Sequence, residues 1–262
     1  MTVAEGPFNQ PGGGASPPED PLRPVLLSGI RAADAGSARS RQAAIGPSEV
    51  GEPCDRRVAY RLLDWPTSNG GDPWFAIIGT AVHAWLADAF GHARHGGRWL
   101  VEQRVTVRPG LRGTADLYDT ARPTVIDWKV VGKSSLDRYR AHGPSPRYRV
   151  QIHLYAAGMV NAGRRVDRVA IAFLPRSGFL DGAHLWSEPF DPAVVERALA
   201  RLDAITELVC LLDPEQAPER WSVIPASPSS ECRFCPFWRP GSTDLSKGCP
   251  GDTPAQIGRT AA

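Results

Sequence analysis

The segment that most constrains the fold is TVIDWKVV, residues 124–131, an apolar stretch that carries an acid and a base two positions apart. Its Val, Ile and Trp side chains are typical of a buried β-strand. Since residues i and i+2 of a strand point to the same face, Asp127 and Lys129 lie side by side there. Such a pair is either a salt bridge at a strand edge or a metal ligand beside a lysine that handles water.

The periodicities around this strand predict an α/β fold. Alternating or apolar runs predict further strands at 99–108, 113–119 and 168–175. Helical spacing predicts helices at 73–95, 148–162 and 191–213. Asp191 and Pro192 suit the start of the last helix. The order helix, strands, helix, strand, helix indicates a mixed central sheet flanked by helices.

Composition divides the chain into a folded domain, residues 44–250, and two tails. Residues 1–43 are rich in Gly, Pro, Ala and Ser without an apolar period, which predicts a disordered tail, and we expect 251–262 to be flexible. No signal peptide and no run of about 20 apolar residues is evident, so we expect a cytoplasmic protein without a membrane span. The net charge of +2 means that nucleic-acid binding requires local basic patches.

Two further residues have the chemistry of metal ligands. Asp116 lies on the strand expected to neighbour Asp127, and Gly113 allows a close approach beside it. Two acids on paired strands can converge on one Mg²⁺ or Mn²⁺ ion. His83 lies on the helix at 73–95 and would favour Mn²⁺ as a third ligand, although a lone helical His is more often a core residue.

These residues, taken together, resemble the RecB-like branch of the PD-(D/E)XK nucleases. The matching pattern is Gly79-x-x-x-His83, Gly113-x-x-Asp116, Asp127-x-Lys129 and Gln151-x-x-x-Tyr155. The resemblance implies a restriction-endonuclease-like core, with His83, Asp116 and Asp127 as ligands of Mg²⁺ or Mn²⁺. It implies that Lys129 is the catalytic lysine and that Gln151 and Tyr155 contact DNA or support the site. Glu102 lies where many relatives carry an acid, so we expect a supporting role for it.

The cysteines point to a second metal site. In a cytoplasmic protein, cysteines are more often metal ligands or free thiols than disulfides. Cys232 and Cys235 form a C-x-x-C pair, Cys249 follows, and Cys54 precedes the core. This arrangement resembles the iron–sulfur nucleases, namely the CRISPR-associated RecB-like exonucleases and the AddB-type helicase–nucleases, although the gap before Cys249 is longer here. The resemblance implies a structural 4Fe–4S cluster joining the N- and C-terminal segments. Zinc and unliganded thiols remain alternatives, and we expect Cys210 to be a buried thiol.

The resemblance implies a metal-dependent DNA exonuclease acting on single-stranded or frayed ends, in recombination, repair or phage DNA processing. The alternatives are a nuclease of CRISPR spacer acquisition and a cluster-stabilised DNA-binding module that does not cleave. A helicase or recombination partner stays open, because the chain has no Gly-x-x-x-x-Gly-Lys-Ser/Thr motif. Without a base-reading motif, we expect DNA contacts that are not sequence-specific. Two groups of arginines could contact phosphates, and tyrosines interleaved with the second group could stack on bases. The alternative for each arginine is a place in a solvated loop. These candidates are Arg56, Arg57, Arg61, Arg138, Arg140, Arg147 and Arg149, with Tyr139 and Tyr148.

Overall fold

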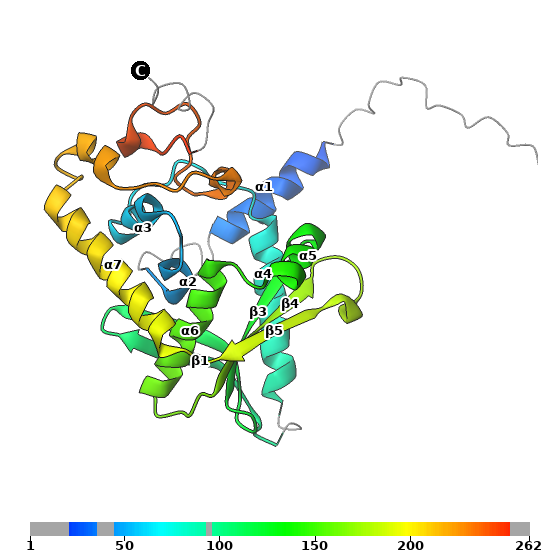
Figure 1. Cartoon of the computed structure of the whole chain (residues 1–262). Helices are drawn as coiled ribbons and strands as arrows, with labels where there is room; N and C mark the ends of the chain where they lie inside the picture. The colour runs from blue at the N-terminus through cyan, green and yellow to red at the C-terminus, as the bar shows by residue number, and fades with distance from the viewer. Residues whose placement is uncertain (1–20, 36–44, 93–95, 252–262) are drawn as a thin grey trace, which may run out of the picture. The chain divides into compact units, whose positions relative to one another are not determined.

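A computed structural model describes residues 21–35, 45–92 and 96–251 (Figure 1). The chain divides into two units, Met1–Arg41 and Gln42–Ala262. The second unit contains the predicted domain, and everything described below except α1 belongs to it. Residues 252–262, for which we expected a flexible tail, lie outside the described residues.

The first unit contains the helix α1 (Leu22–Ala35), none of whose residues is buried. This helix lies within residues 1–43, which we expected to form a disordered tail. Leu22, Val25, Leu26 and Ile30 recur at the spacing of one helical face, and the Gly- and Pro-rich composition around them masks that signal. The rest of the predicted tail, 1–20 and 36–43, lies outside the described residues.

A five-stranded mixed sheet forms the centre of the second unit, which confirms the predicted α/β architecture. Its strands are β1 (Trp99–Arg108), β2 (Leu111–Asp119), β3 (Thr124–Val131), β4 (Arg168–Pro175) and β5 (His184–Pro189). They follow the order β1-β2-β3-β4-β5, with only β3 and β4 parallel. The parallel pair requires a crossover, which the helices between β3 and β4 provide.

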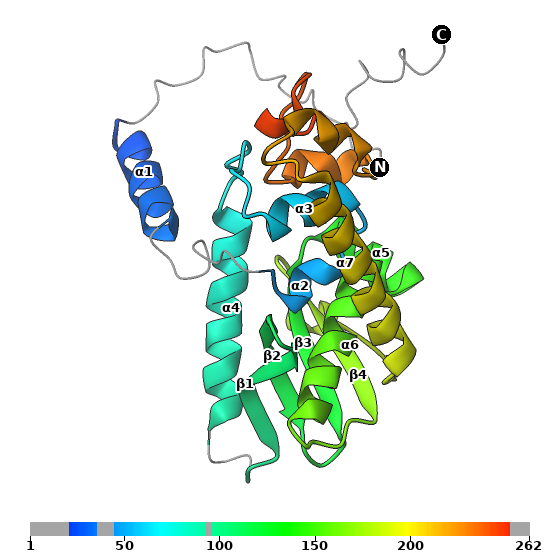
Figure 2. The ribbon, with the colours of Figure 1, turned by 90° about the vertical axis from the view of Figure 1, so that its left-hand side faces the viewer.

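Helices cover both faces of this sheet (Figure 2). One face carries α4 (Trp74–Gly91), whose Phe90 ring lies 5.5 Å from that of Trp128 on β3. The other carries α6 (Pro146–Asn161), and α7 (Pro192–Leu212) packs outside it. Because α6 lies between the sheet and α7, most of its central residues are buried. At the start of α7 the Asp191 side chain accepts the N–H of Ala193 at 2.9 Å, which confirms the predicted cap.

One helix has an unusual surface for its position. Within the described part of the chain, α4 alone is long and apolar enough to cross a membrane by length and composition, contrary to our expectation that no segment would be. Its apolar side chains divide between the sheet and solvent: Leu86 is buried, whereas Trp74, Phe75 and Trp85 are exposed. α4 also positions His83, so part of its role is to build the site described below.

The C-terminal segment folds back over the start of the domain. The remaining elements are α2 (Pro47–Val50), α3 (Asp55–Leu62), α5 (Lys133–His142), η2 (Leu180–Gly182), η3 (Pro218–Val223), η4 (Ser230–Phe234) and η5 (Leu245–Lys247). The Tyr60 hydroxyl on α3 donates to the Leu245 carbonyl at 2.5 Å, and the Tyr60 ring packs 4.1 Å from that of Trp221. The Arg56 N–H also donates to the Pro225 carbonyl at 2.8 Å. These contacts bring the cysteine-bearing ends of the domain together.

Candidate active site and cysteine cavity

The two predicted acids lie where β2 and β3 separate. The strands pair only at Leu117 with Ile126, Tyr118 with Val125, and Asp119 with Thr124. Asp116 and Asp127 occupy the next positions, beyond the last paired residues. Trp128 lies beyond the residues that pair with β2, and its N–H instead donates to Asp116 Oδ2 at 2.9 Å. The splayed strands therefore hold two carboxylates at one open end of the sheet.

Asp127 is buried and engaged through both oxygens. It is 2% exposed; Oδ2 lies 2.5 Å from Lys129 Nζ, and Oδ1 accepts from Gln151 Nε2 at 3.2 Å. Gln151 Nε2 also donates to the Tyr155 hydroxyl at 3.1 Å. Burial raises the pKa of Asp127 to about 6, against the lowering effect of Lys129. The acid and base of β3 thus form an ion pair with each other, as in the first of the two interpretations, although on a central strand rather than at a strand edge.

His83 reaches the same place from α4. Its Nδ1 lies 3.4 Å from Asp116 Oδ2, and its Nε2 lies 2.9 Å from the Trp128 carbonyl oxygen. Burial lowers the pKa of His83, but contact with Asp116 outweighs burial, so that the pKa is raised overall. Both ring nitrogens face acceptors, which suits a protonated imidazole. A metal ion on His83 would have to displace one of these protons.

Glu102 joins this group from β1. Its neighbours Val101 and Gln103 pair with Leu117 and Ala115, which flank Asp116, and Glu102 itself has a φ of 50°, in the left-handed region that a residue other than glycine rarely adopts. Burial and the neighbouring Asp116 raise the pKa of the Glu102 carboxyl, while His83 lowers it. Glu102 is therefore close enough to Asp116 and His83 to interact with both electrostatically.

The two motif glycines have different surroundings. A Cβ added to Gly113 would stand 2.8 Å from the Tyr155 ring and 3.0 Å from Pro47, so only glycine allows this packing. A Cβ on Gly79 would meet nothing within 4 Å. Gly113 therefore serves the contact between β2 and α6, as the sequence predicts, whereas no protein contact requires Gly79.

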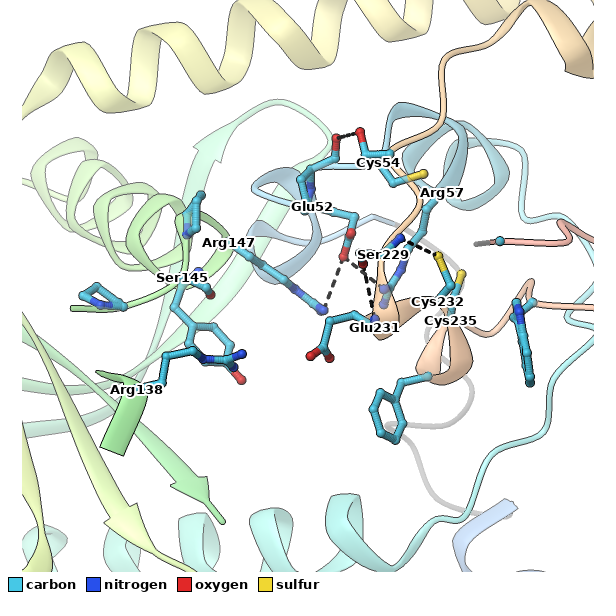
Figure 3. Close-up of a pocket in the computed structure, with 18 of the residues that line it drawn as sticks. Glu52, Cys54, Arg57, Arg138, Ser145, Arg147, Ser229, Glu231, Cys232 and Cys235 are labelled. Carbon is cyan, nitrogen blue, oxygen red and sulfur yellow. Dashed lines mark hydrogen bonds and ion pairs between the residues drawn. The ribbon is translucent and has the colours of Figure 1, made fainter. Parts of the chain in front are cut away.

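The four predicted cluster cysteines line one cavity of about 650 Å³, together with residues of α5 and α6. Figure 3 shows Cys232 and Cys235 next to each other, with Cys54 on a neighbouring segment. Burial raises the pKa of the Cys235 thiol, and Cys54 and Cys249 raise it further. The backbone N–H of Ser229 donates to Cys232 Sγ at 3.3 Å. Cys210, in contrast, is exposed on α7, so the expectation of a buried thiol is wrong.

Neither ligand set is closed around a metal ion. Among the residues that the structure describes, no three His, Cys, Asp or Glu side chains are close enough to hold one. The donor chemistry nevertheless fits both predicted groups. The first set gathers an imidazole and carboxylates, which suits Mn²⁺ or Mg²⁺, and the second gathers four thiols, which suits iron–sulfur or zinc. The residues lining the cysteine cavity include Trp238, whose indole N–H has no partner among the described residues.

The wall of the cavity opposite the cysteines is basic and extends toward Lys129. Glu52 lies 3.1 Å from Arg57 and 3.5 Å from Arg147 and joins the two sides (Figure 3). Tyr148 lines the cavity, and Lys129 Nζ lies 5.0 Å from the centre of its ring. The cavity therefore adjoins the acid site. No sequence pattern points to Glu52, because its partner Arg147 is far along the chain.

The predicted basic residues divide into two groups. Arg57, Arg138 and Arg147 line the cavity. The others have structural partners: Arg149 pairs with Glu188, Arg61 with Glu49, Arg140 with Asp137, and Arg56 donates to the Ile224 carbonyl. Arg56 also approaches the cavity, since its Nη1 lies 3.8 Å from Cys249 Sγ, and two of the lining arginines, Arg57 and Arg147, pair with Glu52.

Comparisons with known proteins give little direct guidance. No protein-family model and no curated protein matches the sequence. Among solved structures, the chain is similar to an alkaline exonuclease, LHK-Exo, from Laribacter hongkongensis, with a TM-score of 0.48 and 14% identity over 71% of this chain and 96% of that one. LHK-Exo in complex with dAMP gives 0.47 and 16% over 70% and 96%. SSO0001 gives 0.42 and 17% over 82% and 94%. At these values the role of the chain has to be argued from its own residues.

Proposed function

We propose that this chain is a metal-dependent DNA exonuclease of the RecB-like PD-(D/E)XK type, and that it carries a 4Fe–4S cluster. The observation that carries the proposal is the gathering of His83, Asp116, Asp127 and Lys129 at the point where β2 and β3 separate. Four polar residues from three elements converge there, two of them almost fully buried. Burying charged groups is costly, so their convergence favours a functional origin.

The reaction is hydrolysis of a phosphodiester, in which a water oxygen attacks phosphorus and the bond to the leaving sugar oxygen breaks. His83, Asp116 and Asp127 would hold Mn²⁺ or Mg²⁺, with Glu102 beside them. The ion supplies a positioned water and an electrostatic partner for the negative charge that develops on phosphate. Lys129 would leave its ion pair with Asp127 and turn its ammonium group toward the water or the phosphate.

Gln151 and Tyr155 would keep the site in order. Gln151 donates to Asp127 and to the Tyr155 hydroxyl, so it fixes the carboxylate while Lys129 moves. Burial raises the pKa of Tyr155, which keeps its hydroxyl neutral and able to donate to DNA. These two residues are positioning residues in this proposal.

The cavity beside the site supports DNA as the substrate. Arg57, Arg138 and Arg147 offer phosphate contacts, and Tyr148 and Tyr139 offer aromatic surfaces for unstacked bases. Such a surface suits single strands and frayed ends without sequence specificity. On the far wall, Cys54, Cys232, Cys235 and Cys249 would hold the cluster and fix the C-terminal segment against α3.

The test is a cleavage assay with anaerobically purified protein. End-labelled single- and double-stranded DNA is incubated with Mn²⁺, Mg²⁺ or EDTA, using wild type, Lys129→Ala and Lys133→Ala. Lys133 is 84% exposed on α5 and serves as a matched control. We expect metal-dependent release of nucleotides by wild type and the control, and loss of this activity in Lys129→Ala.

Two outcomes contradict the proposal. Cleavage by Lys129→Ala at the wild-type rate would remove the site from the mechanism. DNA binding without cleavage under every metal would leave a cluster-stabilised binding module as the better description.

A further inference from the structure

The cysteine cavity contains a buried hydrogen-bond donor that has no partner. The Nε1 of Trp238 is inaccessible to solvent and bonds to no acceptor among the residues that the structure describes. Buried N–H groups are almost always paired, so this one indicates a missing acceptor. Trp238 lines the same cavity as the four cysteines.

The backbone fixes Trp238 among the three C-terminal cysteines. Its N–H donates to the Cys235 carbonyl at 3.0 Å, and the residue forms a β-bridge with Cys249. Its indole and the Cys232 side chain both lie next to Gly251. A Cβ on Gly251 would stand 2.8 Å from Cys232 Cβ and 3.0 Å from Trp238 Nε1. Cys232 and the indole N–H edge therefore both border Gly251, at a position where a larger residue would overlap them.

A second tryptophan provides an internal comparison. Trp221 Nε1 is also buried without a partner among the described residues, but its ring is packed against Tyr60 and does not line the cavity. Trp221 is 0% exposed and belongs to a core cluster that includes Tyr60 and Phe237. The two residues thus share a buried N–H without a partner among the described residues and differ in whether they line the cysteine cavity.

We propose that the indole N–H of Trp238 is a hydrogen-bond donor to the sulfur atoms of the group held by the four cysteines, and that it sets the reduction potential of a 4Fe–4S cluster there. The inference rests on the cluster in the proposed function. Donors to cluster sulfur stabilise the added negative charge of the reduced form and raise the potential. Two other donors already point to the thiols: the Ser229 N–H to Cys232, and Arg56, whose Nη1 lies 3.8 Å from Cys249 Sγ. Trp238 is therefore a positioning and tuning residue in this site.

The experiment uses the full chain purified without oxygen. Trp238 is replaced by Phe and, by genetic incorporation, by 3-benzothienylalanine, which keeps the bicyclic shape and lacks the N–H. Trp221→Phe is the control, since it removes the other unpaired indole N–H. Iron and sulfide are measured first, then the midpoint potential of the visible absorbance and the Fe–S stretching bands in the resonance Raman spectrum.

We expect all variants to retain iron and sulfide. Both Trp238 variants should have a lower midpoint potential than wild type and shifted Fe–S bands, whereas Trp221→Phe should match wild type. A benzothienylalanine variant with the wild-type potential and bands would overturn the inference even if the Phe variant differed, because a difference in Phe alone would reflect lost packing. Zinc, or no metal, in the wild-type protein would overturn the cluster and this inference together. The cleavage test with Lys129→Ala is independent of both results.

Discussion

The acid site and the cysteine cavity are adjacent but are built in opposite ways. In the acid site the polar groups have already found one another: Asp127 bonds Lys129 and Gln151, and Asp116 bonds His83 and the Trp128 N–H. In the cysteine cavity the thiols line open space, and the Trp238 N–H has no partner among the described residues. The acid site is internally satisfied, whereas the cysteine cavity has thiols along open space and a buried indole N–H without a partner among the described residues.

The difference follows from what supports each site. The acids lie on paired strands of a central sheet, and α4 and α6 fix His83 and Gln151 from either side. The cysteines lie on short turns and loops, where a bound group has to supply part of the order. We infer that the acid site keeps its shape without metal and that the cysteine cavity does not. The following predictions test this contrast.

The largest effect is expected at the ion pair of β3. Lys129→Ala should reduce cleavage by about 100- to 10,000-fold, as loss of a group acting on water commonly does. It should also lower the free energy of unfolding by about 3 kcal/mol, because the buried Asp127 carboxylate is left without its partner. Urea unfolding and the end-label assay measure the two quantities.

The double variant Asp127→Asn/Lys129→Ala separates the effect on cleavage from the effect on stability. Removing both charges should restore most of the stability and none of the cleavage, since the Asn side chain can still bond Gln151. A double variant as unstable as Lys129→Ala would contradict the claim that the acid site is internally satisfied.

The second prediction concerns the cysteine cavity. Cys232→Ala should lose the bound group and lower the free energy of unfolding by about 4 kcal/mol, because a cross-link between residues 54 and 232 closes a very long loop. Loss of solubility should precede loss of cleavage. Cys210→Ala should change stability by no more than about 0.5 kcal/mol, since that thiol is exposed. If the Cys232→Ala protein is soluble and fully active without metal, the cysteine-bearing segments fold without a bound group, and the prediction is wrong.

The third prediction compares the two motif glycines. Gly113→Ala should cost about 1–3 kcal/mol, because the new methyl group would overlap the Tyr155 ring and Pro47. Gly79→Ala should be neutral or stabilise α4 by about 0.5–1 kcal/mol, because alanine favours a helix and space is open there. Thermal unfolding of both variants measures this. A stable Gly79→Ala protein that no longer cleaves DNA would indicate that Gly79 makes room for substrate; a destabilised one would contradict the prediction.

The sequence predicts the fold well where periodicity is local. The runs at 99–108, 124–131 and 168–175 coincide with β1, β3 and β4, because each is an uninterrupted alternating or apolar stretch. The edge strand β5 and the helix α5 were not predicted. Both are short and polar, so tertiary contacts rather than pattern decide their structure: β5 pairs along β4, and α5 buries only Leu136 and Tyr139.

The residues of the candidate site also divide into those that the sequence indicates and those that only the folded chain brings together. The spacing of His83, Asp116, Asp127 and Lys129 indicates a site because each residue type is unusual in its local context. The contact of Glu52 with Arg147 and the position of Trp238 leave no such trace, since each depends on segments that meet only in the folded chain. The strained backbone of Glu102 is likewise invisible in a run that reads as a regular strand.

The smallest effect is expected at Asp119, a second buried aspartate on β2, three residues from Asp116 and at the paired end of the strands. The partly exposed Arg98 bonds both of its oxygens and, with the N–H groups of Ala121 and Arg122, lowers the pKa of the Asp119 carboxyl. A pKa below the unfolded value of about 4 stabilises the fold at higher pH, and this contribution is lost as the pH falls through the folded pKa.

Asp119→Asn should therefore lower the urea midpoint slightly at pH 7, and the difference in urea midpoint from wild type should narrow as the pH is lowered from 5 toward 2. A gap that is independent of pH would mean that shape rather than charge matters at Asp119. A gap that narrows would show that this carboxylate belongs to the structure, in contrast to Asp127, whose pKa burial moves in the opposite direction.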